Sequence, residues 1–342
     1  MKNWISNSTD NNDMVLSSRV RFARNIKNFP FPHKLEEDRG KSLAKDIENA
    51  FYEIEEIKDE FNNVDLWEIG ENQGRNYLEK HLISTNLLNS RNKSAFILSK
   101  DETISLMINE EDHIRLQCIT AGLNIKEAYE VANKIDDALE ARLDFAFDEK
   151  LGYLTACPTN LGTGMRVSAM LHLPALTMKD EINDALKALT QLGMTLRGLY
   201  GEGSKAEGNI YQVSNQITLG MKEEDILSNL EAVVAQLISQ ENRARDQLLG
   251  RYKYELEDKI YRSLGVLKNA RILTSKEALD LLSNVRMGVE MSILKDIDKV
   301  KLNKLLVETQ PATLQLVTGK ELKAKERDIE RANLIRRYFD GK

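Results

Sequence analysis

The chain has 342 residues, of which 42% are hydrophobic and 30% are charged, and its net charge is −6. This composition is typical of a soluble globular protein of about two domains, and the negative charge argues against general attraction to nucleic acid or anionic lipid. The sequence has no apolar run near the roughly 20 residues that a membrane span needs, and its first 13 residues lack a signal-peptide core. The low number of cysteines, Cys118 and Cys157, predicts a reducing, cytoplasmic location. The four histidines do not have the spacing of a zinc site.

The first 250 residues mix strands and helices. Apolar runs at 95–98 and 104–108 predict an antiparallel hairpin, and residues 115–119 alternate as the next strand. Asn124 and Glu127 fit an N-cap and a capping box ahead of apolar residues at helical spacing. The remaining expected elements are strands at 153–157, 194–200 and 210–214, and amphipathic helices at 180–192 and 222–240.

After about Gly250 the pattern is helical throughout. Thr274 and Glu277 form a second capping pair, and Pro311 and Gly319 separate the later helices. The sequence therefore predicts an α+β fold, with an antiparallel sheet flanked by helices and followed by a small all-α domain. The expected divisions are an N-terminal extension at 1–13, a mixed domain at 14–250 and a helical domain at 251–342.

A dense cluster of charge fills residues 109–115, directly after the strand expected at 104–108. It holds three carboxylates, a histidine and Arg115, which is more charge than a strand end needs for folding. A site that grips a cation and an anion together explains the cluster better. We expect Asp112 and His113 to orient this segment, whereas Glu110 fits either a structural or a chemical role.

The arginines predict the anion. Arg19 and Arg21 are two residues apart, so an extended strand places both on one face. Arg115, Arg166 and Arg197 each stand at a strand end or near glycine, where a guanidinium can grip phosphate oxygens. The alternative for any one of them is ordinary surface charge. Neither a P-loop nor the motif set of eukaryotic protein kinases is present, so arginines would have to hold a nucleotide.

Together these motifs resemble a known family, the ATP:guanidino phosphotransferases or phosphagen kinases. Segments matching the family's motifs occur in family order at 17–21, 109–115, 157–164 and 197–202, and the resemblance covers roughly residues 14–245. It implies that 14–250 is a phosphagen-kinase-like catalytic domain that uses ATP with Mg²⁺ and has no tightly bound cofactor. The ATP-binding residues that it implies are Ser17, Ser18, Arg19, Val20, Arg21, His81, Arg115, Arg166, Val167, Ser168, Ala169, Met170, Arg197, Gly198, Leu199, Tyr200 and Gly201.

The resemblance also implies three catalytic residues. Glu111 and Glu202 would grip the acceptor guanidinium and remove its proton, although Glu202 taken alone fits a loop-surface charge. Cys157 matches the family's reactive cysteine, whose thiolate the arginines would favour, although an isolated cysteine is more often structural. Cys118, within an expected strand, is interpreted as structural.

Two features resemble a bacterial branch of the family that phosphorylates arginine in proteins. Only 16 residues precede Ser17, so the family's helical N-terminal domain is expected to be missing, and helices follow the catalytic domain instead. Residues 327–332 match a phosphoarginine-binding regulatory pocket of Arg327, Asp328, Arg331 and Ala332. The alternative is a solvated helix with Asp328–Arg331 and Arg327–Glu330 pairs.

The resemblance thus implies a protein arginine kinase that marks proteins for Clp-type proteolysis and regulates a stress response. It further implies a zinc-finger activator, a stress-gene repressor and a Clp ATPase as partners, and a homodimer formed through the helical domain. One alternative is a kinase for free arginine or another small guanidino substrate. Another is a non-catalytic phosphoarginine reader that keeps the fold.

Overall fold

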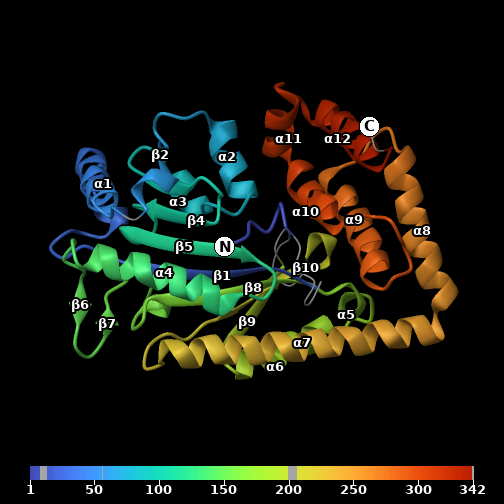
Figure 1. Cartoon of the computed structure of the whole chain (residues 1–342), viewed down its shortest axis with the longest axis horizontal. Coiled ribbons are helices and arrows are strands. Elements are labelled where there is room, and N and C mark those ends of the chain that lie inside the picture. Colours follow the sequence, from blue (N-terminus) through green and yellow to red (C-terminus); the bar gives the residue numbers. More distant parts are fainter. Residues whose placement is uncertain (8–13, 56, 199–205, 341–342) are drawn as a thin grey trace.

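The structure, a computed structural model, describes residues 1–7, 14–55, 57–198 and 206–340. Within this part of the chain an eight-stranded antiparallel sheet forms the centre of the molecule, and helices coloured orange and red in Figure 1 lie beyond one end of it. None of the described helices combines the length and the apolarity required to cross a bilayer. The predicted α+β fold is confirmed.

The sheet runs in the order β2-β3-β4-β5-β1-β8-β10-β9, and β6 and β7 form a separate small hairpin. Strand β1 lies at the centre, where it pairs with β5 on one side and β8 on the other. The strand bounds are β1 Val15–Arg24, β2 Phe61–Asp65, β3 Ala95–Ser99, β4 Ile104–Ile108, β5 Ile114–Ala121, β6 Phe147–Asp148, β7 Gly152–Tyr153, β8 Met165–His172, β9 Met194–Gly198 and β10 Ile210–Asn215.

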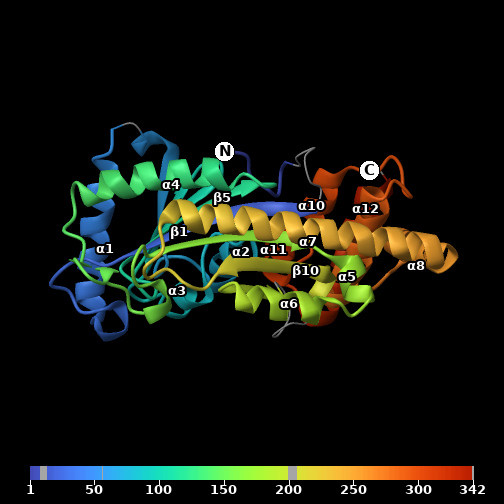
Figure 2. The same cartoon turned by 90° about the horizontal axis from the view of Figure 1, so that it is seen from below.

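The helices that accompany the sheet end with α7, which runs lengthwise along the molecule toward the last helices (Figures 1 and 2). These helices are α1 Glu37–Tyr52, α2 Glu71–Glu79, α3 Thr85–Asn89, α4 Ile125–Glu140, α5 Pro174–Met178, α6 Ile182–Gln191 and α7 Glu223–Arg251. The helical region that follows contains α8 Lys253–Asn269, α9 Ser275–Glu290, α10 Lys299–Glu308, α11 Pro311–Thr318 and α12 Ala324–Asp340.

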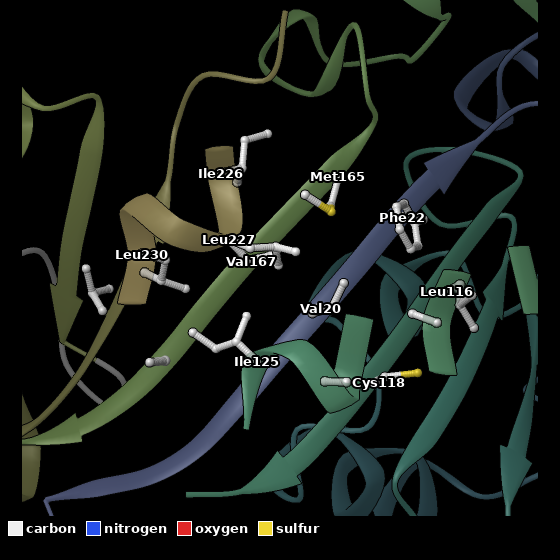
Figure 3. Close-up of a cluster of buried hydrophobic side chains, with 14 of the residues drawn as sticks. Val20, Phe22, Leu116, Cys118, Ile125, Met165, Val167, Ile226, Leu227 and Leu230 are labelled. Carbon is white, nitrogen blue, oxygen red and sulfur yellow. The ribbon is translucent and has the colours of Figure 1, made fainter. Parts of the chain in front are cut away.

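The two faces of the central strands have different surroundings. Alternate residues such as Val20 and Phe22 of β1 are fully buried in the main hydrophobic core. Figure 3 shows them packed with Ile125 at the start of α4 and with Leu227 and Leu230 at the start of α7. Deleting a buried phenylalanine side chain from such a core costs about 3–5 kcal/mol. Helices α4 and α7 therefore cover one face of the central strands, and the intervening residues of β1 point to the other.

A second core joins the sheet region to the helical region. Trp4 near the N-terminus and Leu16 of β1 are buried together with apolar residues of α8, α9 and α10. His172 of β8 lies 3.2 Å from Glu290 of α9, and Arg245 of α7 donates to the same carboxylate at 2.7 Å. Apolar packing and a buried ionic network thus fix the helical region to the sheet.

Most predicted elements are confirmed. The hairpin of β3 and β4 pairs antiparallel, β5, β10 and α6 lie where they were expected, and the side chain of Thr274 accepts a hydrogen bond from the Glu277 amide. Pro311 begins α11 and Gly319 ends it in a left-handed conformation. Helix α7 ends at Arg251, and the described elements that follow it are all helices, as predicted.

Three local predictions were wrong. Asn124 is the N-cap of α4 but makes no side-chain cap, because its amide turns back to donate to the carbonyl of Ala121. The strand at 153–157 stops after Tyr153, since the amide of Ala156 turns to donate to Asp112. Helix α7 continues to Arg251 rather than ending near residue 240, because Ala244 and Arg245 are buried and extend its packed face.

Candidate active site

Arginines gather on the sheet face opposite α4 and α7. In the register of the sheet, Arg21 of β1 is paired with Arg166 of β8 on one side and with Gln117 of β5 on the other. Arg19 lies two residues before Arg21 and is paired with Ser168 of β8. Because side chains alternate along a strand, Arg19 and Arg21 share one face, as predicted from their spacing.

Arg115 and Arg197 join this face from other strands. Arg115 of β5 lies opposite Ala23, so it stands two residues along from Gln117. Arg197 of β9 lies opposite Gln212 of β10. The tertiary structure thus places all five predicted phosphate-binding arginines on one face, from four different strands. We call this set, Arg19, Arg21, Arg115, Arg166 and Arg197, the arginine face.

The charges on the arginine face repel one another. Burial, and then the charges of Arg115 and Arg166, lower the pKa of the Arg19 guanidinium to about 9. Burial and the same kind of repulsion hold the pKa of Arg21 well below its usual value. The Nε atoms of Arg21 and Arg166 are buried without a hydrogen-bond partner in the described part of the chain. Unpaired buried donors are costly, so these atoms fit a site that an anion completes.

Neutral side chains on the same face hold the arginines in place. Arg19 donates to Ser168 Oγ at 3.3 Å and to Gln117 Oε1 at 3.4 Å, and Arg166 donates to Ser214 Oγ at 3.4 Å. Gln117 and Ser214 were not predicted as site residues. The alternation of Arg115 and Gln117 along one strand was a signal for Gln117, whereas Ser214 depends on strand pairing that the sequence does not show.

The charge cluster at 109–115 forms the loop of the β4–β5 hairpin and the start of β5. Asn109 adopts a left-handed conformation and its amide donates to the His113 carbonyl at 2.9 Å, which closes the loop. Asp112 is buried and accepts from the Asn25 side chain at 2.6 Å and from the Ala156 amide at 2.7 Å. The His113 ring lies 3.0 Å from the amide of Ile26. Asp112 and His113 therefore orient this segment, as expected.

The pKa values of the two glutamates of this loop, Glu110 and Glu111, are shifted in opposite directions. Glu110 is buried and pairs with Arg115 at 2.5 Å. Burial opposes ionisation there, but the charge of Arg115 and hydrogen bonds from Ser84 and Arg115 outweigh it and lower the pKa of Glu110. Glu111 is half-buried, and burial followed by the charges of Asp112 and Glu110 raises the pKa of its carboxyl. A raised pKa suits a group that takes up a proton.

Cys157 stands near the same charges. It precedes a short 3₁₀ turn at Pro158–Asn160, and its Sγ lies 3.0 Å from Thr159 Oγ1. Burial, and then the charges of Arg197 and Arg115, lower the pKa of the nearby Arg166 guanidinium, and Cys157 and Glu111 lie close enough to oppose this shift. Cys118 faces the opposite side of the sheet and is fully buried in the core shown in Figure 3, so its structural interpretation is confirmed.

The loop that follows Cys157 is shaped to bring Arg166 close. Gly164 has φ of 64°, and an added Cβ would lie 2.6 Å from the carbonyl oxygen of Ala23. The Ala23 amide donates to the Gly164 carbonyl at 2.9 Å. Only glycine fits this approach of the loop to β1, which sets where β8 and Arg166 begin.

His81 lies beside the arginine face. With Ser17, Arg19, Ser168 and Met170, and with Ile119 and Gln212, it lines a small pocket of about 20 Å³. Burial, and then the charge of Arg19, lower the pKa of the His81 imidazole to about 3. The ring is therefore neutral at physiological pH.

Other predicted ATP-binding residues lie elsewhere. The side chains of Ser18, Val20, Val167 and Ala169 are buried on the core face of the same strands, so they do not point toward the arginines. Gly198 ends β9. Leu199, Tyr200, Gly201 and the predicted catalytic Glu202 lie outside the described residues. The described residues contain no group of three or more histidines, cysteines or carboxylates that could hold a metal ion.

The segment 327–332 lies on α12. Arg331 is buried, and its guanidinium donates to the carbonyls of Thr309 and Leu273 at 2.7 and 2.8 Å and pairs with Asp328 at 2.6 Å. Arg327 donates to the carbonyl of Leu322 at 3.0 Å. The Asp328–Arg331 pair of the alternative interpretation is present, but the helix face that carries Arg331 is packed rather than solvated. Ala332 is fully buried.

Comparison with known proteins identifies the family. The family model for "ATP:guanido phosphotransferase, C-terminal catalytic domain" matches residues 42–244, which is more than half of the chain. The chain belongs to the ATP:guanido phosphotransferase family. A second model, "Protein-arginine kinase McsB C-terminal domain", matches residues 253–341. The first match begins after β1, although β1 supplies Arg19 and Arg21 to the centre of the sheet.

Relatives within the family are similar over almost their whole length. A protein-arginine kinase of Clostridium acetobutylicum is 59% identical over 336 residues, covering 98% of this chain and 99% of that protein. One from Clostridium kluyveri is 58% identical over 98% of both chains. One from Moorella thermoacetica is 47% identical over 99% of this chain and 97% of that protein. These identities place the chain in the protein-arginine kinase branch of the family.

Solved structures support the same fold. Lombricine kinase matches with a TM-score of 0.60 and 24% identity, covering 71% of this chain and 70% of that one. The duplicated taurocyamine kinase from Schistosoma mansoni with bound transition-state analogue components matches with a TM-score of 0.61 and 23% identity, covering 76% of this chain and 39% of that one. At such identities the likeness concerns the fold alone.

Proposed function

We propose that this chain transfers the γ-phosphoryl group of ATP to arginine side chains of proteins. The observation that carries the proposal is the arginine face, an array of mutually repelling cations that adjoins Glu111, a carboxylate with a raised pKa. Relatives named protein-arginine kinase share up to 59% identity with the chain, which supports arginine in a protein as the acceptor.

In this mechanism the arginine face holds the triphosphate. Phosphoryl transfer depends on positioning and on charge neutralisation, and Arg21 and Arg166 offer buried, unpaired Nε–H donors for both. Mg²⁺ would arrive as part of the nucleotide substrate, bound to its β- and γ-phosphates.

The acceptor guanidinium would lie against Glu111. The pKa of this guanidinium lies far above neutral pH, which makes it a cation and a poor nucleophile. As its nitrogen bonds to the γ-phosphorus and the bond to the ADP oxygen breaks, Glu111 accepts the proton that the nitrogen loses. Glu202 is predicted to hold the other edge of the guanidinium, and Cys157 to orient it from beside Arg166.

The remaining predictions concern regulation and location. Arg327, Asp328, Arg331 and Ala332 are proposed as a phosphoarginine pocket, in which Arg327 would be the main donor because Arg331 already holds three protein acceptors. The division at residue 250 and the cytoplasmic location remain predictions from the sequence pattern and composition. Clp-type proteolysis, the stress response and the activator, repressor and Clp partners remain predictions from the resemblance.

A homodimer through the helical region is proposed on the same basis. Tyr254 and Tyr261 of α8 are seven residues apart, so they share one side of the helix, and they are 80% and 54% exposed. Exposed aromatic side chains on one helix face support an interface there. Sedimentation of Tyr254→Ser with Tyr261→Ser tests it, since the wild type should sediment as a dimer and the variant as a monomer.

The catalytic proposal is tested by incubating the full chain with MgATP and either an arginine-rich protein or free arginine. Mass spectrometry under conditions that preserve acid-labile phosphoarginine should find the modification on the protein, and Glu111→Gln should abolish it. Phosphate on free arginine alone would favour the small-substrate kinase. No transfer to either acceptor by the wild type would favour a non-catalytic reader.

A further inference from the structure

Glu79, the last residue of α2, connects the sheet region to α11. Its carboxylate accepts hydrogen bonds from the amides of Ala312 and Thr313 at 2.9 and 2.7 Å, and the Thr313 hydroxyl donates to it at 2.7 Å. One turn earlier on α2, Asn76 donates to Thr313 Oγ1 at 3.0 Å. The carboxylate thereby pairs amides that the first turn of a helix leaves unsatisfied. Figures 1 and 2 both show α2 beside α11.

The same end of α2 reaches the arginine face. His81 follows Glu79 by two residues and turns the chain with φ of 63°. The carbonyl of His81 accepts a hydrogen bond from Gln117 Nε2 at 2.8 Å, and Gln117 Oε1 accepts one from Arg19 at 3.4 Å. The point at which α2 ends therefore sets where the His81 carbonyl lies. That carbonyl orients the side-chain amide of Gln117, which in turn accepts a hydrogen bond from Arg19.

The other side of the connection enters the helical region. Thr309, the C-cap of α10, precedes α11 by two residues, and its carbonyl accepts from Arg331 of α12 at 2.7 Å. Short contacts thus run from α12 through the start of α11 to Glu79, and from Glu79 through His81 and Gln117 to Arg19. Each step is a hydrogen bond or a chain segment of at most four residues.

We propose that Glu79 is a positioning residue through which the helical region sets the geometry of the nucleotide site. The proposal rests on the proposed function only in taking the arginine face as the place where ATP binds. A carboxylate that holds α11 keeps the end of α2, and with it His81 and Gln117, in the arrangement that presents Arg19 to a phosphate. Loss of this carboxylate releases the end of α2 from α11. We therefore expect the affinity of the protein for nucleotide to fall. Coupling between sites typically changes affinity by about 5- to 150-fold.

A merely structural role for Glu79 makes a different prediction. If its carboxylate only fastens α11 to α2, a substitution lowers thermal stability and leaves the affinity of the folded protein for nucleotide unchanged. Spatial continuity does not separate the two roles, because coupling has to be measured as a free energy. The affinity for MgATP separates them.

The test compares Glu79→Gln with Glu71→Gln in the full chain. Both change one glutamate of α2, but Glu71 is exposed and pairs only with Arg75 on its own helix in the described structure. Titration calorimetry with MgATP should give a dissociation constant about 5- to 20-fold weaker for Glu79→Gln, at the lower end of coupling between sites. Glu71→Gln should bind as the wild type does. Thermal melts without nucleotide record the stability of each variant.

Equal MgATP affinity in folded Glu79→Gln and in the wild type would overturn the proposal. If Glu79→Gln does not fold, Thr313→Val removes one donor to the same carboxylate and should weaken MgATP binding by about 2- to 5-fold; unchanged affinity there would overturn it equally. The measurement requires no arginine acceptor. Weaker MgATP binding in a protein that phosphorylates no arginine would therefore support this inference while the proposed function fails.

Discussion

Arg21 of β1 and Arg166 of β8 face each other in the register of the sheet, and the Nε of each is buried without a hydrogen-bond partner in the described structure. Two cations side by side destabilise the fold unless an anion joins them. Repulsion between the two guanidinium groups therefore lowers the stability of the protein until an anionic ligand binds. Removing one of these charges should raise the stability of the free protein and lower its activity.

Replacing Arg21 by Met should remove one of the repelling charges while keeping an apolar stem of similar length. We expect the melting temperature without nucleotide to stay the same or rise, and the rate of phosphoryl transfer to fall by about 10²–10³, as for loss of one preorganised charge contact. The stabilisation by MgATP should shrink. Melting curves with and without MgATP and a transfer assay check this. Arg75→Met, at an exposed pair on α2, is the control, and a strongly destabilised but fully active Arg21→Met would contradict the prediction.

The pH dependence of the rate of phosphoryl transfer should reflect the protonation state of Glu111. As a base it acts only when deprotonated, and because burial and its acidic neighbours raise its pKa above 4.5, the rate should fall as pH drops through that raised value. Glu110, whose pKa is lowered, titrates below 4.5 and does not cause this fall. The measurement is kcat/KM against pH for wild type and Glu110→Gln.

Glu110→Gln should keep an acid limb but shift it to lower pH, because the Glu110 charge that helps raise the pKa of Glu111 is gone. The overall rate should also fall, because Arg115 loses its partner. An acid limb that moves below pH 4.5 in the wild type, or that disappears in Glu110→Gln, would assign the titration to another group.

The two cysteines should differ in reactivity. Cys157 is half-buried and Cys118 is fully buried. Iodoacetamide should modify Cys157 in the folded protein and Cys118 only after unfolding, as peptide mass spectrometry can show. MgATP should slow the modification of Cys157, since the nucleotide would bind at Arg166, which lies near Cys157. Equal labelling rates with and without MgATP would place Cys157 away from the bound substrate.

The ionic network around Glu290 should control acid stability. Glu290 is buried and, although burial opposes ionisation, the charges of His172, Arg245 and Arg286 hold its pKa well below 4.5. A depressed pKa contributes stability that is present above the unfolded value and lost as pH falls toward the folded one. Glu290→Gln should therefore cost about 3–5 kcal/mol at pH 7, because it removes the buried carboxylate that Arg245 and Arg286 share.

Urea unfolding from pH 7 to pH 3 measures this contribution. The wild type should lose stability steadily below about pH 4.5, and Glu290→Gln should lose less over the same interval because its contribution is already absent. The surface change Glu71→Gln should follow the wild type. Parallel curves for wild type and Glu290→Gln would show that other groups dominate acid unfolding.

Substitutions of Arg327 and Arg331 should have different effects, the first on phosphoarginine binding and the second on stability. Arg331→Ala leaves the buried carbonyls of Thr309 and Leu273 without their donor, which should cost about 2–6 kcal/mol, from about 1–3 kcal/mol for each of the two unsatisfied groups. Arg327→Ala should keep the melting temperature within about 2 °C, since surface substitutions stay within about 0.5 kcal/mol, and should weaken binding of free phosphoarginine. Calorimetry on both variants checks this, and unchanged phosphoarginine binding in Arg327→Ala would argue against the pocket.

Patterns within single segments predicted much of the site. The spacing of Arg19 and Arg21 placed both on one face because alternation is a local property of a strand. The crowding at 109–115 marked a special loop, because so many charges cannot all face solvent beside a buried strand. The same kind of local argument failed at Asn124, whose side chain found a competing acceptor in the Ala121 carbonyl.

The sequence by itself determined which chemical groups the protein has, the antiparallel hairpins, the change to helices after residue 250 and, through ordered motifs, the family. Only the tertiary structure decided which of those groups meet. Strand pairing set Arg166 against Arg21, and the packing of α12 buried the Arg331 guanidinium among backbone carbonyls. Burial acts on both Glu110 and Glu111, but only at Glu110 do the charge of Arg115 and hydrogen bonds outweigh it and lower the pKa. The physical reason is that pKa shifts and unpaired donors depend on neighbours distant in the chain, which no local pattern records.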